Sequence, residues 1–194
     1  MRKPENIRLL QQAIACLDDV QAYKQLFLLF HPSLLQFAIS ILKSKELSEE
    51  IVSDVFIKIW QKRQQLDKIE NLQFYLFTAV KNRAINKLQE QKKNTAISID
   101  EAHIEIRSIY HDPEQKLISA EMIQDIHAAI QQLPTRCRLI FKLVKEDGLK
   151  YKEVAELLHI SLKTVENQMS LAFKKIAGAI HFKPHQLATV FSKN

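Results

Sequence analysis

Polar side chains recur at helical spacing along LKTVENQMSLAFKKI, residues 162–176. Apolar residues, Leu162, Val165 and Ile176 among them, share one side of the predicted helix, and the opposite side is polar. Lysine and asparagine can read guanine and adenine in a DNA major groove, and threonine can contact a thymine methyl group. The side chains that we expect to enter such a groove are Lys163, Thr164, Asn167, Ser170 and Lys174. This face is predicted to read duplex DNA.

The residues before this segment complete a helix-turn-helix pattern. A short helix is predicted at 151–159, Ile160 is expected to be buried in the turn, and Ser161 is placed to cap the second helix. Basic residues around the motif, expected to contact phosphates without reading bases, are Arg136, Arg138, Lys150, Lys152 and Lys175. An ordinary helical hairpin with a polar face is the alternative interpretation.

A second polar face lies along the predicted helix 72–92, whose apolar stripe runs from Leu72 to Leu88. Aromatic rings offer bases a stacking surface, and amides can hydrogen-bond the exposed edges of unpaired bases. The residues expected to contact a melted strand are Tyr75, Asn82, Arg83, Asn86 and Lys87. A plain solvated helix face would show a similar pattern, and the sequence leaves that alternative open.

The helix predicted at 48–63 carries an apolar residue on the face that is expected to be solvent-exposed. Val52, Phe56 and Ile59 form its core stripe, whereas the opposite face holds Glu50, Asp54, Ile57 and Gln61. An exposed isoleucine between carboxylates is a candidate protein-docking patch. A single exposed isoleucine is also ordinary, and on the pattern alone this plainer interpretation is favoured.

Helical periodicity covers almost the whole chain, so the predicted fold class is all-α, with two helical domains joined by a linker. Pro32 is expected to begin a separate helix, Ser48 to cap the next one, and Pro113 to open a helix that runs to about Gln132. The predicted organisation is a domain at 1–93, an acidic linker at 94–113, a domain at 114–180 and a short tail at 181–194.

The composition excludes several common classes of protein. Gly148 and Gly178, the only glycines in 194 residues, cannot form a dinucleotide-binding fingerprint or a phosphate-binding loop. Cys16 and Cys137 form no CxxC pair, and both are expected to be buried hydrophobic residues in a reducing compartment. The longest apolar run, 26–30, falls well short of the roughly 18 residues of a membrane span. We therefore expect a soluble cytoplasmic protein.

The net charge of +6 is unevenly distributed. Residues 71–93 carry five basic side chains and one acidic side chain, and residues 134–194 carry eleven basic and five acidic ones. Between them, residues 94–133 carry seven acidic and two basic side chains. Two basic blocks around an acidic one favour a polyanion held at two places, although solvated surface is the plainer alternative.

Four stretches of the chain, in this order, resemble bacterial sigma factors of the extracytoplasmic-function (ECF) group, the minimal members of the sigma-70 family. The stretches are AYKQLFLLFHPSLLQFA, SEEIVSDVFIKIWQKR, FYLFTAVKNRAINKLQ and QLPTRCRLIFKLVKEDGLKYKEVAELLHISLKTVENQMSLAFKKI. The resemblance implies two helical domains, sigma region 2 and sigma region 4. It also implies an RNA polymerase sigma factor that directs promoter recognition, DNA melting and transcription initiation.

The resemblance further implies partners. The helix 50–63 would dock on the β′ clamp helices of core RNA polymerase, which gives Asp54 and Ile57 a reason to be exposed. The second domain would lean on the polymerase β flap. As a regulator the resemblance implies an anti-sigma factor, which would occlude these polymerase-binding surfaces.

Promoter DNA would be bound in two forms, as the resemblance implies. The helix 74–93, with the loop 68–71, would face the melted strand of the minus-10 element, and the helix 162–175 would read the minus-35 duplex. His159 stands at a turn position where this family often has glycine, and histidine tolerates left-handed geometry better than most residues.

Two other functional classes stay open on the sequence. The helix-turn-helix alone also resembles LuxR-type regulators, so a conventional activator or repressor that binds duplex DNA without polymerase is the second candidate. An enzyme is the third. The seven histidines include no HExxH motif, and Pro184 interrupts the pair His181 and His185, so we expect no catalytic residue, no metal site and no cofactor.

Overall fold

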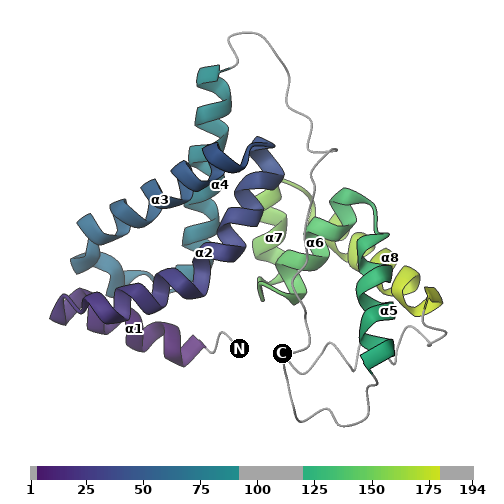
Figure 1. Ribbon diagram of the computed structural model, residues 1–194, viewed down its shortest axis with the longest axis horizontal. Coiled ribbons are helices and arrows are strands. Elements are labelled where there is room, and N and C mark those ends of the chain that lie inside the picture. Colours follow the sequence, from purple (N-terminus) through teal and green to yellow (C-terminus); the bar gives the residue numbers. More distant parts are fainter. Residues whose placement is uncertain (1–3, 92–119, 180–194) are drawn as a thin grey trace. The chain divides into compact units, whose positions relative to one another are not determined.

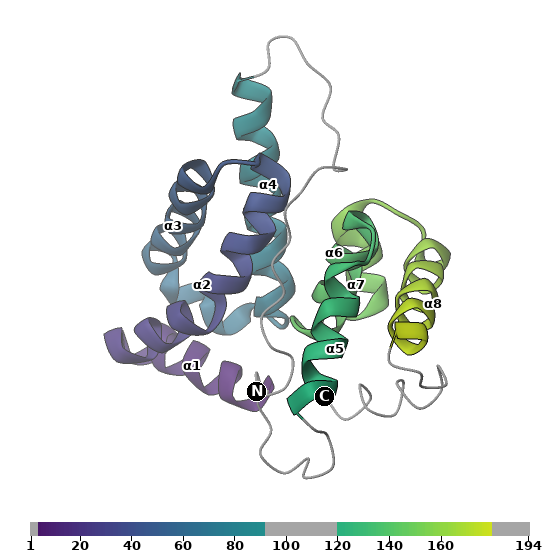
Figure 2. The ribbon, with the colours of Figure 1, turned by 45° about the vertical axis from the view of Figure 1, so that its right-hand side comes forward.

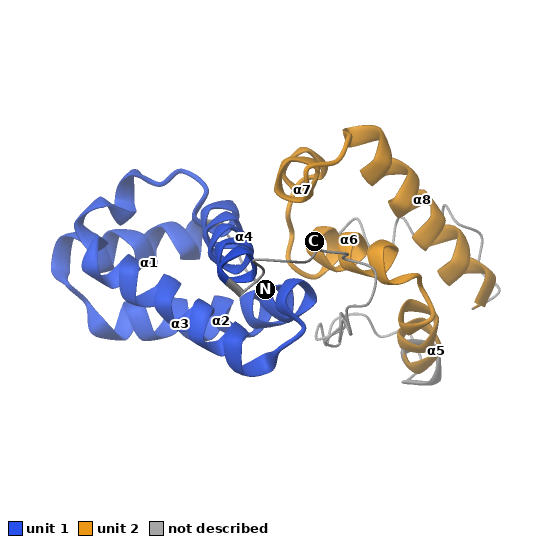
Figure 3. Ribbon diagram, turned by 90° about the horizontal axis from the view of Figure 1, so that it is seen from above, with its two compact units in different colours: residues 1–102 blue, residues 103–194 orange. Residues whose placement is uncertain are grey.

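The computed structural model describes residues 4–91 and 120–179, and every regular element in these ranges is helical (Figure 1). The chain divides into two compact units, residues 1–102 and 103–194, shown in blue and orange in Figure 3. Each unit has its own buried core. The prediction of an all-α fold with two helical domains is confirmed.

Parts of the predicted organisation lie outside the described residues. These parts are the linker 94–113, the tail 181–194 and the start of the helix predicted at Pro113. The bounds predicted for the two domains, 1–93 and 114–180, stay predictions.

The helices of the first unit are α1 (Pro4–Leu17), α2 (Val20–Leu42), α3 (Lys45–Gln61), the 3-10 helix η1 (Arg63–Lys68) and α4 (Leu72–Gln91). The long helix α2 packs against α1, α3 and α4 (Figure 2). Aromatic rings join these helices. The rings of Phe37 and Phe77 meet edge to face with centroids 5.2 Å apart, and those of Phe27 and Phe56 with centroids 4.8 Å apart. This core fixes α3 and α4 relative to each other.

Helix α2 runs through Pro32 without a break, so the prediction of a separate helix from this residue is wrong. An internal proline removes one helical hydrogen bond and costs about 3 kcal/mol. Burial of Phe30 and Leu34 on either side of it offsets that cost, because each large side chain contributes about 1.5–3 kcal/mol. By length and composition α2 would also suit a membrane span, but many of its apolar side chains, Leu26, Phe30 and Leu34 among them, are buried in the core of this unit.

The start of α3 also differs from the prediction. Ser44, not Ser48, caps this helix, because its side-chain oxygen accepts a hydrogen bond from the Leu47 amide at 3.3 Å. Lys43 adopts a left-handed conformation that ends α2, which places Ser44 at the first free amides of α3. Ser48 lies buried one turn later and donates to the Ser44 carbonyl oxygen.

The helices of the second unit are α5 (Ala120–Gln131), α6 (Thr135–Lys145), α7 (Tyr151–Leu158) and α8 (Leu162–Ala179). Helix α8 packs against the other three. Gly148, with φ of +74°, makes the turn after α6. Beside that turn, Lys142 is buried and its Nζ lies 3.0 Å from Asp147 Oδ2, so the two buried charges neutralise each other.

Candidate nucleic-acid interface

The turn between α7 and α8 has the geometry of a helix-turn-helix. His159 ends α7 in a left-handed conformation with φ of 51°, and its amide donates to the carbonyl oxygens of Ala155 and Glu156. Ser161 caps α8, as predicted, because its Oγ accepts a hydrogen bond from the Thr164 amide at 3.0 Å. Ile160, expected to be buried in this turn, is half-buried.

Helix α8 separates its apolar and polar sides as the spacing predicts. Val165, Met169 and Ile176 are buried against the other helices of the unit. The predicted groove residues that are exposed are Lys163, Asn167, Ser170 and Lys174. Thr164, the fifth, is half-buried and shares a 2.8 Å hydrogen bond with the Ser161 hydroxyl. Four of the five therefore lie where a major groove can reach them.

Leu162 was placed on the apolar side by its spacing, but it is 37% exposed, so this expectation is wrong. It is the first residue of α8, where the chain is still leaving the turn. The neighbouring ion pair of Lys163 and Glu166, at 3.5 Å, is exposed and leaves the lysine mobile enough to change partner.

The predicted phosphate contacts separate into two kinds. Arg136, Lys152 and Lys175 are exposed on α6, α7 and α8, and Lys150 is exposed just before α7. Arg138 instead donates to the side-chain oxygen of Gln131 at 3.2 Å and to the Leu133 carbonyl oxygen at 2.9 Å. Its guanidinium therefore closes the turn between α5 and α6, which sequence spacing cannot reveal.

Helix α4 presents the second predicted nucleic-acid face. Tyr75 is 43% exposed, and Asn82 and Asn86 are exposed on the same helix. The apolar stripe from Leu72 to Leu88 is buried as predicted. An exposed ring and two exposed amides on one helix suit a single strand, because every base has a face to stack and edges to bond.

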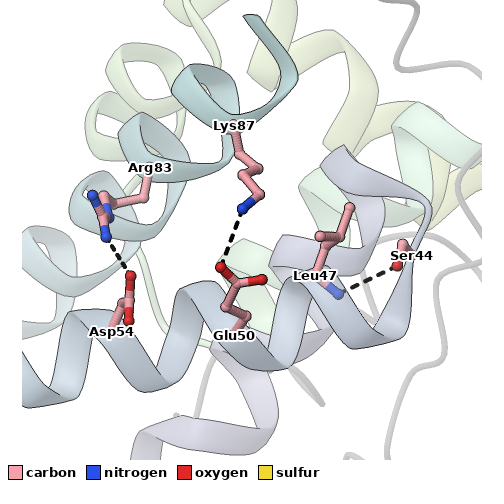
Figure 4. Close-up of polar contacts among 6 residues, drawn as sticks. All are labelled: Ser44, Leu47, Glu50, Asp54, Arg83 and Lys87. Atoms are coloured by element: carbon pink, nitrogen blue, oxygen red, sulfur yellow. Dashed lines mark hydrogen bonds and ion pairs between the residues drawn. The ribbon is translucent and has the colours of Figure 1, made fainter. Parts of the chain in front are cut away.

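The two cations of this face, however, already have partners on α3 (Figure 4). Arg83 forms an ion pair with Asp54, and Lys87 Nζ lies 3.1 Å from Glu50 Oε1. The two cations are four residues apart on α4, and the two carboxylates that they contact are four residues apart on α3. The sequence predicted Glu50 and Asp54 as docking residues and Arg83 and Lys87 as strand-binding residues, and it missed that they contact each other.

The other two predicted docking residues, Ile57 and Gln61, are exposed. Ile57 is 54% exposed and Gln61 is also exposed on α3. The side chains in both ion pairs keep substantial contact with solvent, so each pair stabilises the fold by about 0.2–1 kcal/mol. Groups held this weakly can exchange partners when a nucleic acid or another protein approaches.

The two cysteines differ from one another. Cys137 is buried as expected, and burial raises the pKa of its thiol to about 11, which makes it unreactive near neutral pH. Cys16 is exposed on α1, so the expectation that it is buried is wrong. Among the described residues, no group of three histidine, cysteine, aspartate or glutamate side chains is arranged to hold a metal ion.

Family comparisons agree with this division into two units. Residues 26–94 match the family described as sigma-70 region 2, and residues 123–176 match sigma-70 region 4. Together the two matches span more than half of the chain. The chain belongs to the sigma-70 family. It is a sigma factor of the ECF group and acts with RNA polymerase in transcription initiation.

Two curated relatives align over most of this sigma factor. The ECF RNA polymerase sigma factor SigW of Bacillus subtilis is 22% identical over 158 residues, which cover 78% of this chain and 84% of SigW. The RNA polymerase sigma-H factor of Pseudomonas aeruginosa is 21% identical over 170 residues, which cover 84% of this chain and 88% of that factor.

Two solved structures also match, one of them a sigma factor by name. CnrH, solved in complex with the cytosolic domain of CnrY, is 18% identical with a TM-score of 0.47, and the match covers 91% of this chain and 97% of CnrH. RpoE from Bartonella quintana, solved with the anti-sigma factor NepR, is 25% identical with a TM-score of 0.48. That match covers 84% of this chain and 98% of RpoE.

Proposed function

We propose that this sigma factor directs promoter recognition and DNA melting through three helices, α3, α4 and α8, each with one binding surface. The observation that carries the proposal is that an acidic and apolar face on α3 adjoins an aromatic, amide-rich and basic face on α4. The Arg83–Asp54 and Lys87–Glu50 pairs join these faces. One small unit therefore offers adjacent surfaces for a protein and for a single strand.

Helix α3 binds core RNA polymerase at the β′ clamp helices. Ile57 provides the apolar centre of this contact, because moving its exposed side chain into a pocket removes apolar surface from water. Glu50, Asp54 and Gln61 form a polar rim around it. The carboxylates complement a basic surface on the partner and set the orientation of docking.

Helix α4 binds the unpaired strand of the minus-10 element. Tyr75 stacks on a base, an interaction of about 1–3 kcal/mol, while Asn82 and Asn86 hydrogen-bond base edges. Arg83 and Lys87 contact phosphates once polymerase has engaged the carboxylates of α3. Polymerase docking and strand binding thus both require the same two ion pairs to open. Because either event opens them, each event favours the other.

Helix α8 reads the minus-35 duplex with the exposed side chains Lys163, Asn167, Ser170 and Lys174 and with the half-buried Thr164. Arg136, Lys152 and Lys175 hold the flanking phosphates, which makes binding depend on salt. The second unit also contacts the polymerase β flap.

Membership of the ECF group supports the rest of the proposal. An anti-sigma factor regulates this chain by covering the α3 docking face. The chain works in the cytoplasm beside polymerase and contributes no catalytic residue, metal or cofactor of its own, since polymerase performs the chemistry.

A gel-shift experiment with purified chain and duplex promoter fragments tests the proposal. We expect a promoter-specific complex only when core RNA polymerase is present. The Ile57→Asp variant should lose core binding, whereas Leu28→Asp, a matched change at an exposed apolar residue of α2, should keep it. Tight duplex binding without polymerase, with no effect of Ile57→Asp, would instead identify a conventional DNA-binding regulator.

A further inference from the structure

Side chains of α1 hydrogen-bond the backbone at the end of η1. Gln11 Nε2 donates to the carbonyl oxygens of Leu66 and Ile69, at 2.8 Å each. A guanidinium nitrogen of Arg8, one turn earlier on α1, donates to the carbonyl oxygen of Asp67 between them. Because both partners of Gln11 are acceptors, the amide must present its nitrogen to them. Three neighbouring carbonyl groups are thus held from one face of α1.

Burial makes the Gln11 contacts firm. Gln11 is 2% exposed, so water cannot replace either hydrogen bond without opening the packing. The last carbonyl oxygens of a helix have no partner within that helix. At the end of η1 the Leu66 carbonyl oxygen accepts from the Ile69 amide at 3.2 Å, and α1 provides the further donors. The Gln11 contacts bridge 55 and 58 residues of the sequence.

The segment held in this way leads directly into the strand-binding helix. The segment 68–71 starts at the last residue of η1 and ends directly before α4. Asn71 caps α4 because its Oδ1 accepts a hydrogen bond from the Phe74 amide at 3.0 Å. The Tyr75 amide, next along, donates to the Asn71 carbonyl oxygen at 3.0 Å. The path from Gln11 to Tyr75 therefore runs through the Ile69 carbonyl group, the short backbone from Ile69 to Asn71, and the hydrogen bonds that Asn71 accepts at the start of α4.

We propose that Gln11 is a positioning residue for base recognition in the melted strand, acting through the segment 68–71. This inference rests on the proposed function, in which that segment and Tyr75 face the unpaired strand. Helix α1 precedes the region 2 match at residues 26–94, so the positioning contact comes from outside the matched segment. Loss of the Gln11 bonds removes the donor to the Ile69 carbonyl oxygen and leaves the Leu66 carbonyl oxygen with the Ile69 amide alone. The segment can then shift, which weakens discrimination between bases.

The test uses holoenzyme reconstituted from the full chain and bacterial core RNA polymerase. Templates carry a preformed bubble whose unpaired strand is randomised over six positions, and the bound fraction is sequenced. The variant is Gln11→Met, which keeps the volume and removes the donors; Gln12→Met, at an exposed neighbour on α1, is the matched control. Core binding and thermal unfolding are measured in parallel.

Wild type should enrich a defined base at one or more positions, and Gln12→Met should match it. Gln11→Met should reduce the ratio between the best and worst base at least fivefold, with core binding within twofold of wild type. A variant that loses thermal stability but keeps the wild-type base preference would overturn the proposal, since Gln11 would then be structural only.

Two further outcomes also decide the question. If wild-type holoenzyme shows no base preference in the bubble, the proposed function fails, and the positioning role fails with it. If Gln11→Met cannot fold, the Arg8→Met variant takes its place. Arg8 is exposed, and its substitution removes only the hydrogen bond to the Asp67 carbonyl oxygen. For Arg8→Met we expect the ratio between the best and worst base to fall about twofold at the same positions. An unchanged ratio would contradict the proposal.

Discussion

The two faces proposed to bind nucleic acid, on α4 and on α8, differ in how their cations are held. On α4, Arg83 and Lys87 are paired with carboxylates of α3 in the same unit. On α8, Lys163 pairs only with Glu166 of the same helix, in an exposed contact of 3.5 Å. Lys174 and Lys175 have no carboxylate at ion-pair distance among the described side chains. The α8 face is therefore ready for a duplex, whereas the α4 face has to exchange partners before its cations can bind a strand.

This difference matches the two forms of DNA that the faces are proposed to bind. A duplex is present before initiation, so a ready surface suits it. A melted strand exists only in the complex with polymerase, and a face whose cations are released by docking on α3 would bind it at that stage. Sequence spacing alone presents the two faces as equivalent.

The largest effect is expected at the aromatic ring of the α4 face. Tyr75→Ala should weaken binding of holoenzyme to a bubble template by roughly 5–100-fold, because base stacking contributes about 1–3 kcal/mol. Tyr75→Phe keeps the ring and should stay within about threefold of wild type. Fluorescence anisotropy on labelled bubble templates measures both. Equal losses for the two variants would show that the hydroxyl group, not stacking, makes the contact.

A comparable loss is expected at Asn167 on the α8 face. Asn167→Ala should weaken binding of the holoenzyme to the minus-35 duplex by about 1–3 kcal/mol and relax the base preference at one position. Asn86→Ala on α4 is the reciprocal control, since it should affect bubble templates and leave the duplex unchanged. Competition assays with single-base variants of the duplex provide the measurement. If both variants impaired both templates equally, the two faces would not be separate sites.

The cap of α8 should affect the stability of only one unit. Ser161→Ala removes the hydrogen bond to the Thr164 amide and should lower the free energy of unfolding of the second unit by about 1 kcal/mol. Ser170→Ala, at an exposed serine of the same helix, should change it by less than about 0.5 kcal/mol. Hydrogen exchange resolves the two units. A loss of protection in the first unit as well would show that the units unfold together.

The smallest effect tests the exchange of partners itself. Asp54→Asn frees Arg83 and should raise binding of the isolated chain to single strands about twofold to fivefold at low salt, while stability changes by less than about 1 kcal/mol. Glu49→Gln makes the same change in net charge at a residue that pairs with Lys45 within α3, and should have a smaller effect. Equal gains in both variants would mean that net charge alone is responsible.

Periodicity in the sequence predicts the faces of single helices well. The exposed side of α8 and the buried stripe of α4 follow from spacing, because burial on one side of a helix imposes the 3.6-residue repeat. Ser161 was also predicted correctly, since a hydroxyl directly before an apolar helix caps it.

Features decided by distant residues could not be predicted. The Arg83–Asp54 and Lys87–Glu50 pairs join residues 29 and 37 apart, and the Gln11 contacts span 55 and 58 residues. The continuity of α2 through Pro32 depends on the core around it, which outweighs the local preference of proline. The sequence predicts Ser48 as the cap of α3, but the left-handed Lys43 ends α2 earlier and makes Ser44 the cap.

Mapping of transcript starts tests directly whether this chain selects the promoters at which polymerase begins. Core RNA polymerase reconstituted with this chain transcribes a pool of genomic fragments, and the 5′ ends are sequenced. We expect transcript starts that depend on the chain, share one minus-10 and minus-35 pair, and disappear with Ile57→Asp. Starts identical to those of core polymerase alone would contradict this expectation.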